Sequence, residues 1–143
     1  MIQQPPVLIF VNSIGAIEDL VAKLRQEQFH CCGIHSQYPQ RIRDAIMRAF
    51  TEGEDWREMK RIGGLDILVT SSLLERGIDL CVDNVIIYEM PDTIEKFLHR
   101  AGRTGRADRK GTVTAFITNG WALIQEYRTL LRQAHQPDIR LEA

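Results

Sequence analysis

The sequence lacks the features that indicate a membrane or secreted protein. No apolar run in its 143 residues approaches the roughly 20 needed to cross a bilayer. The N-terminus has neither the basic start nor the apolar stretch of a signal peptide. The three cysteines are odd in number and Cys31 and Cys32 are adjacent, so neither a disulfide framework nor a CxxC metal site is indicated. We therefore expect an intracellular protein with reduced, core-facing thiols and no association with a membrane.

The sequence also lacks an excess of charge of either sign. Its 18 lysines and arginines against 19 aspartates and glutamates give a net charge of -1, which offers no global argument for nucleic-acid binding. The charges are unevenly placed, however. Acidic residues gather at 52–55, and a short cationic segment contains Arg100, Arg103, Arg106, Arg109 and Lys110. A local cationic site suits a small anion or one stretch of nucleic-acid backbone, and a solvated charged face is the alternative.

Short β-branched runs alternate with longer amphipathic stretches along the chain. We expect strands at 7–11, 30–35, 65–69, 85–88 and 112–117, with helices beginning after Ser13, at Pro39, at 91–93 and over 121–134. Strands separated by helices of about 10 to 15 residues imply right-handed βαβ units. We predict one α/β domain across 1–143, with helices on both faces of a mainly parallel sheet. The charged segment 51–66 is predicted to be a surface insertion.

The most informative segment is 99–106, His-Arg-Ala-Gly-Arg-Thr-Gly-Arg. Open parallel sheets bind ligands where their strands end, so the loops after Val11, His35, Val69 and Tyr88 are also candidates. In 99–106 two arginines stand three apart, each preceded by glycine. On a helix both guanidinium groups would share one face, and such a pair suits the oxygens of a triphosphate. A surface helix paired with acidic neighbours is the alternative.

Segment 99–106 resembles motif VI of the DEAD-box RNA helicases, written HRxGRTGR. Three further segments resemble motifs of this family in the expected order: 8–13 resembles motif IV, His35 with 40–43 resembles the H-G…QxxR element, and 68–79 resembles motif V. The resemblance extends from about Val7 to Ile117. It implies a three-layer α/β/α RecA-like domain, the second of the two lobes of an ATP-dependent RNA helicase.

The resemblance implies a role for each matched residue. Arg103 and Arg106 would reach the γ-phosphate of ATP, with Arg106 favoured as the arginine finger. Asp79 would accept hydrogen bonds from the ribose, Gly77 would adjoin the nucleotide, and His99 would link the nucleotide site to the other lobe. The expected contacts with RNA phosphates are Asn12, Ser13, Arg43, Ser71 and Gly77, and such contacts bind RNA independently of its sequence.

Structural roles without ligand binding remain open for some of these residues. Asp79 could cap a turn, Arg76 is better explained by a structural role, and His35 and Tyr38 could be ordinary strand-end residues. Three departures from the family pattern are also present. Ser71-Ser72 replaces Thr-Asp, Ser36 replaces a glycine, and 51–66 is longer than expected, which makes it a candidate for a protein contact through Trp56.

Two motifs that a complete ATPase needs are absent. The sequence contains neither a GxxxxGK[ST] phosphate loop nor an Asp-Glu-Ala-Asp stretch to hold Mg²⁺, and no GxGxxG follows the first strand. We therefore expect ATP and Mg²⁺ to be held mainly by a first RecA-like lobe, and the lone chain to be an inactive monomer. Single-stranded or duplex RNA is the expected partner. Alternatives are a DNA-directed superfamily 2 lobe and a binding module without ATP turnover.

Overall fold

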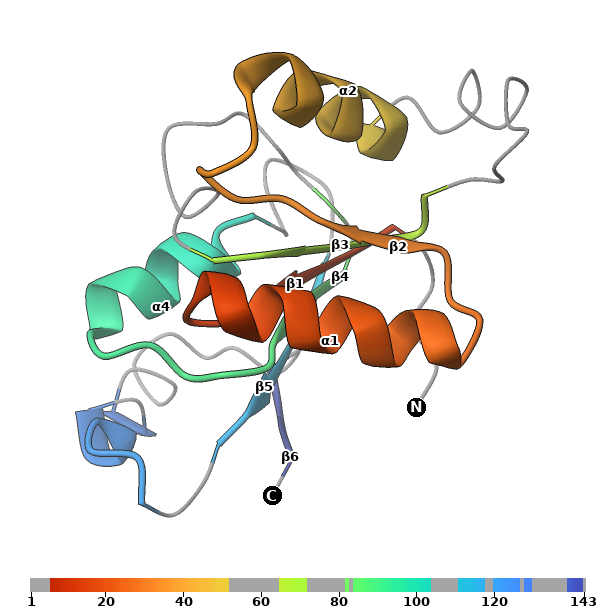
Figure 1. Ribbon diagram of the computed structural model, residues 1–143. Helices are drawn as coiled ribbons and strands as arrows, with labels where there is room; N and C mark the ends of the chain where they lie inside the picture. The colour runs from red at the N-terminus through yellow and green to blue at the C-terminus, as the bar shows by residue number, and fades with distance from the viewer. Residues whose placement is uncertain are drawn as a thin grey trace.

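The computed structural model describes residues 6–51, 65–71, 82, 84–103, 111–117, 120–126, 128–129 and 139–142. Its described strands form one six-stranded sheet in the order β2-β3-β1-β4-β5-β6 (Figure 1). These are β1 Val7–Phe10, β2 Cys31–Gly33, β3 Ile67–Thr70, β4 Asn84–Ile87, β5 Thr112–Phe116 and β6 Ile139–Glu142. Every pairing is parallel, which confirms the predicted sheet. Strand β6, which pairs with β5, was not predicted from the sequence.

Three described helices connect the strands: α1 Ile14–Gln26, α2 Gln40–Thr51 and α4 Ile94–Ala101. Ser13 caps α1 as predicted, because its Oγ accepts a hydrogen bond from the Ala16 N–H at 3.1 Å. Thr93 caps α4 in the same way, with Lys96 N–H as donor at 3.1 Å. Of the helix predicted over 121–134, residues 124–126 and 128–129 are helical.

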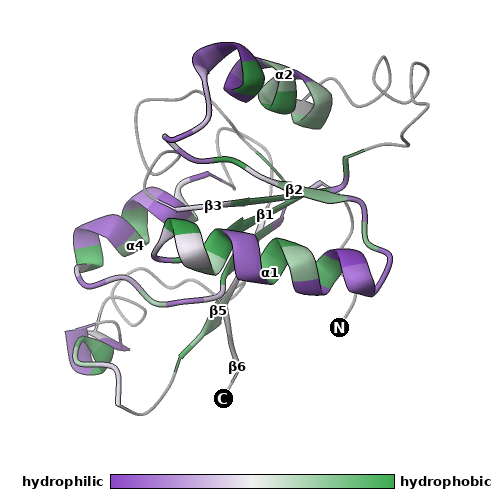
Figure 2. Ribbon diagram, in the orientation of Figure 1, coloured by the Kyte–Doolittle hydropathy of each residue, from purple (hydrophilic) through white to green (hydrophobic). Residues whose placement is uncertain are grey.

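The helices cover both faces of the sheet, which confirms the three-layer α/β/α prediction. Strand β1 explains why: its apolar run is buried throughout, and successive side chains point to opposite faces. Ile9 joins a cluster with Ile17 and Val21 of α1, whereas Phe10 joins a cluster with Phe50 of α2 and Phe97 of α4. Figure 2 shows strands β1, β3 and β5 as mainly hydrophobic and the helices as a mixture of hydrophobic and hydrophilic residues.

Helix α1 packs closely on β2 because the strand ends in a glycine. A Cβ added to Gly33 would lie 2.5 Å from Cγ2 of Ile17, a distance that real side chains do not adopt. The adjacent Cys31 and Cys32 belong to opposite faces of the same strand. Cys31 is buried and Cys32 half-buried, and both are free thiols, as the sequence predicted. Burial is the main reason that the pKa of each thiol is raised.

Candidate functional site

The carboxyl ends of the strands gather several of the predicted site residues at one edge of the sheet. Asn12 and Ser13 come directly after β1, Ser71 after β3, and His35 shortly after β2. Because β1 and β3 pair with Phe10 opposite Thr70, the ends of these two strands lie side by side. Four residues from three separate segments of the sequence thus share one edge, as the parallel sheet predicted.

Arg100 of α4 is the centre of a buried cluster at this edge. Its side chain is 2% exposed. One guanidinium nitrogen donates to the Glu89 carbonyl at 2.8 Å, and the other donates to the Val11 carbonyl at 3.2 Å and to Oδ1 of Asn12 at 2.9 Å. The guanidinium carbon also lies 5.4 Å from the centre of the Phe10 ring, within the range of a cation–π interaction. The prediction that Arg100 belongs to an anion-binding surface is therefore wrong, because its donors are used inside the protein.

Asn12 is the second member of this Arg100 cluster. Its amide nitrogen donates to the Met90 carbonyl at 3.0 Å, and its backbone N–H donates to a carboxylate oxygen of Glu89 at 2.8 Å. Asn12 is exposed, but both ends of its side chain make hydrogen bonds within the protein. Sequence reasoning missed Glu89 altogether, and its position one residue after Tyr88 at a strand end was the available signal.

A cavity of about 530 Å³ opens beside the Arg100 cluster, and Asp92, Lys96 and Trp121 contribute to its wall. The Asp92 carboxylate lies 2.9 Å from Nζ of Lys96, and this hydrogen bond and charge hold the pKa of Asp92 below its usual value. Nε1 of Trp121 donates to the Pro91 carbonyl at 3.0 Å, and the ring packs on the core.

His99 and Arg103 lie at and just beyond the last turn of α4. Nδ1 of His99 is buried without a hydrogen-bond partner among the described residues. Arg103 is 6% exposed, and its carbonyl accepts the Val82 N–H at 2.8 Å. Gly77, Asp79 and Arg106, together with Ser72, Arg76 and residues 52–64 of the predicted insertion 51–66, lie outside the described residues.

His35 lies in the connection from β2 to α2, and Arg43 lies in the first turn of α2. Both are near the carboxyl end of β2, the strand at one end of the sheet. Nε of Arg43 donates to the Tyr38 carbonyl at 3.2 Å, and the His35 ring lies 4.0 Å from the Tyr38 ring. The turn between them does not need the glycine that Ser36 replaces. Among the described non-glycine residues only Gln28 has a positive φ, so Ser36 adopts an ordinary backbone conformation.

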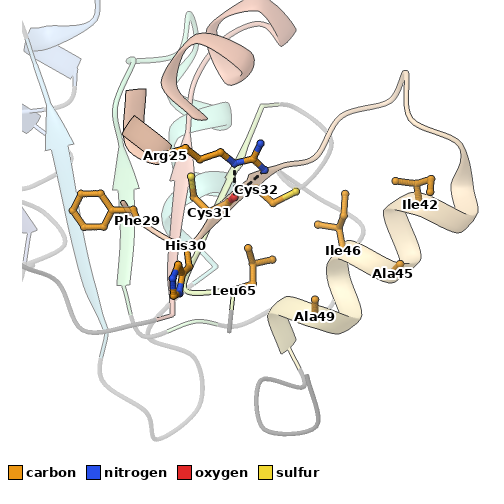
Figure 3. A pocket seen from close by; sticks show the side chains of 10 residues that line it. All are labelled: Arg25, Phe29, His30, Cys31, Cys32, Ile42, Ala45, Ile46, Ala49 and Leu65. Carbon is orange, nitrogen blue, oxygen red and sulfur yellow. Dashed lines mark hydrogen bonds between the residues drawn. The ribbon is translucent and has the colours of Figure 1, made fainter. Parts of the chain in front are cut away.

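A groove of about 450 Å³ separates α2 from β2 and the end of α1 (Figure 3). Figure 3 shows Ile42, Ala45, Ile46 and Ala49 along α2 on one side and Cys32 on the other. With Phe50, these four α2 residues form one apolar stripe along the helix. Ala49 and Phe50 are buried, but Ile42 is 38% exposed, so the outer half of the stripe lines the groove instead.

Two kinds of feature are absent from the part of the chain that the structure describes. It contains no helix long and apolar enough to cross a membrane. It also contains no group of three or more histidine, cysteine, aspartate or glutamate side chains that could hold a metal ion.

Comparison with known proteins relates this chain to one family. The profile of the helicase conserved C-terminal domain matches residues 2–108. The ATP-dependent RNA helicase eIF4A of Saccharomyces cerevisiae (strain YJM789) is 41% identical over 113 residues, which are 78% of this chain and 26% of that protein. The pre-mRNA-splicing ATP-dependent RNA helicase PRP28 of Cryptococcus neoformans (strain JEC21) is 37% identical over 116 residues, 80% of this chain and 14% of that protein. The chain thus spans about a quarter or less of these relatives.

Solved structures show the same fold. The C-terminal domain of the DEAD-box protein Dbp5 superposes with a TM-score of 0.77 at 24% identity, over 98% of this chain and 76% of that one. Prp28 from Chaetomium thermophilum, bound to ADP, superposes with a TM-score of 0.79 at 29% identity, over 96% of this chain and 32% of that one.

Proposed function

The chain belongs to the helicase conserved C-terminal domain family, as a domain of the DEAD-box type, and we propose that it is one half of an ATP-dependent RNA helicase. The observation that carries this proposal is the shared carboxyl edge of β1 and β3, where residues from motifs IV and V lie side by side. A first RecA-like lobe on another part of the same polypeptide would face this edge and close the site.

In this proposal Arg103 and Arg106 stabilise the charge that develops on the γ-phosphate of ATP, and Arg106 is the arginine finger. Asp79 binds the ribose, Gly77 lies against the nucleotide, and His99 communicates with the first lobe. Arg103 is 6% exposed, so its side chain must turn outward to meet a phosphate when the lobes close. When bound, ATP would supply the phosphoryl group and Mg²⁺ would neutralise its charge, and the first lobe would hold the metal. ADP in the related Prp28 structure supports a nucleotide site in this family.

RNA binding is proposed for Asn12, Ser13, Arg43, Ser71 and Gly77. The Ser13 oxygen accepts the Ala16 N–H, which leaves its hydroxyl hydrogen to donate to a phosphate oxygen. Backbone contacts of this type bind RNA without reading its bases. The relatives are named as RNA helicases, one of them for pre-mRNA splicing, so RNA processing inside the cell is the proposed setting.

The groove beside α2 supports a secondary proposal of a protein contact at 51–66. Helix α2 ends at Thr51, where this segment begins, and Leu65, one residue before its end, lines the groove. A protein that binds the segment would therefore also reach an apolar surface.

Hydrolysis of ATP tests the main proposal. We expect no turnover by the chain alone, and RNA-stimulated turnover once it is joined to its first lobe. Arg106→Ala should lower that turnover by about a thousandfold, the usual contribution of an arginine finger. The matched control is Arg109→Ala, three residues further along the same cationic segment, which should change turnover less than twofold.

Three outcomes would redirect the proposal. Near-normal turnover in Arg106→Ala would remove the finger from this residue. A folded two-lobed protein without any turnover would favour the binding module, and stimulation by DNA equal to that by RNA of the same sequence would favour a DNA-directed lobe.

A further inference from the structure

His35 is a buried histidine to which the proposed function assigns no role. It is 3% exposed at the end of β2. Its Nδ1 accepts the Gln37 N–H at 3.3 Å, and its carbonyl accepts the Tyr38 N–H at 3.2 Å. Its ring lies against the Tyr38 ring with 32° between the two planes. A backbone carbonyl, a ring nitrogen and a ring face of one residue thus hold the turn over residues 35–38.

This turn decides where Arg43 points. The Tyr38 carbonyl accepts a hydrogen bond from Nε of Arg43. The two terminal guanidinium nitrogens make no hydrogen bond in the described part of the chain. Two such nitrogens on one edge of a planar cation fit two oxygens of a phosphate. Burial raises the pKa of the Tyr38 phenol, so this ring remains neutral and does not compete for the guanidinium.

The second ring nitrogen of His35 faces a carboxylate. Because Nδ1 accepts a hydrogen bond, the proton of the neutral ring lies on Nε2. Nε2 is buried without a hydrogen-bond partner among the described residues, and Oε1 of Glu18 in α1 lies 3.7 Å away. The Glu18 side chain is 64% exposed, so a small rotation can bring it to hydrogen-bond distance and stabilise this tautomer.

We propose that His35 is a positioning residue for RNA binding. It holds the turn over residues 35–38 so that the Tyr38 carbonyl orients Arg43 toward an RNA phosphate, and Glu18 holds the imidazole in the tautomer that this turn requires. The inference rests on the proposed contact between Arg43 and RNA. It assigns functions to His35, Tyr38 and Glu18, of which the first two could otherwise be ordinary strand-end residues.

The test is a titration of the chain with a short oligouridylate, followed by the amide NMR signals of residues 12–13 and 34–43. His35→Phe keeps a ring against Tyr38 but removes both nitrogens. We expect it to weaken RNA binding about tenfold, equivalent to one hydrogen bond to a charged group. His35→Asn, whose side-chain oxygen can accept the Gln37 N–H, should recover part of this loss.

Arg43→Ala separates the inference from the proposed function. If His35 acts through Arg43, the double variant His35→Phe/Arg43→Ala should bind RNA no more weakly than Arg43→Ala alone. Unchanged binding by Arg43→Ala would refute the proposed RNA contact of that residue. Weaker binding by Arg43→Ala together with normal binding by a folded His35→Phe would refute only the positioning role.

If His35→Phe impairs folding, the tautomer of the His35 ring can be measured in the unsubstituted chain instead. Nitrogen-15 spectra of the unsubstituted chain should show His35 with its proton on Nε2, and a proton on Nδ1 would overturn the proposal. Glu18→Gln, an exposed substitution, should speed exchange of the Nε2 proton and weaken RNA binding a few-fold. Glu27→Gln, at the end of the same helix, is the control and should change neither, and equal behaviour of the two variants would remove Glu18 from the proposal.

Discussion

Arg100 and Arg43 lie at the same edge of one sheet, and the fold uses them in opposite ways. The guanidinium of Arg100 is buried and donates to two carbonyls and one amide oxygen. Arg43 is half-buried and, among the described residues, donates only from Nε and to a single carbonyl. The residue type and the position in a helix near the carboxyl ends of the strands are shared, so neither decides the role. Burial and the number of acceptors within reach decide it, because a buried guanidinium that donates three hydrogen bonds inside the protein is closed to a ligand.

The two arginines also differ in the sequence separation between each of them and its hydrogen-bond partners. Arg100 bonds to Val11 and Asn12 at sequence separations of 89 and 88 residues, so it joins β1, β4 and α4. Arg43 bonds to Tyr38, five residues away. A change at the Arg100 cluster therefore acts on the whole sheet, whereas a change at Arg43 acts on one turn.

Removing the Arg100 guanidinium should have the largest effect on stability. Arg100→Met keeps the apolar volume but leaves one buried and two partly buried acceptors without their donor, and we expect the free energy of unfolding to fall by about 3–5 kcal/mol. Urea denaturation followed by circular dichroism measures it. Arg48→Met, at an exposed position of α2, is the control and should stay within about 0.5 kcal/mol. A loss below about 1 kcal/mol in Arg100→Met would refute the comparison.

Gly33→Ala tests the tight face of β2, opposite the α2 groove. Its new methyl group would meet Cγ2 of Ile17, and overpacking of this kind costs about 1–3 kcal/mol. Removing that methyl in the double variant with Ile17→Ala should make the two costs clearly less than additive. Gly15→Ala is the control, because no atom lies within 4 Å of its added Cβ and the helix gains about 0.5–1 kcal/mol. Equal effects of Gly33→Ala and Gly15→Ala in denaturation would contradict the close approach of α1.

Arg43→Ala should leave stability nearly unchanged, and this sharpens the contrast with Arg100. The substitution removes one hydrogen bond at a half-exposed position, so we expect a change within about 0.5 kcal/mol by the same urea measurement. A loss as large as that of Arg100→Met would show that Arg43 is a structural residue too, and the proposed RNA contact would lose its support.

The smallest effect concerns the ion pair at the start of α4, beside the Arg100 cluster. Lys96 lowers the folded pKa of Asp92 from its ordinary 3.8, so the contribution of this group to stability is present above pH 3.8. It is lost as the pH falls through the folded pKa. Asp92→Asn should therefore be slightly less stable than the parent at pH 7 and equal to it at the acid end, in urea titrations at matched pH. High salt should shrink the difference, since Asp92 is exposed. A gap that widens toward acid would contradict the sign of the shift.

Much of the fold could be predicted because it is encoded by local interactions. The helix starts at Ser13 and Thr93 follow from a hydroxyl three residues before the N–H that it caps. Five strands follow from short apolar runs, and their parallel pairing follows from the helices between them. Strand β6 was missed because Ile-Arg-Leu-Glu is four residues long and alternates without a continuous apolar run.

By itself the sequence determined the α/β class, five of the six described strands, the helix caps and the resemblance of four ordered motifs to one family. Each of these depends on residues close together in the chain, where spacing alone implies geometry. Only the tertiary structure decided that Arg100 is buried, that Glu89 and Asn12 close around it, that α2 leaves a groove beside β2, and that Glu18 faces His35. These contacts depend on the order of the strands and the approach of the helices, which bring distant residues together. A guanidinium donates to whichever acceptors that packing places within reach.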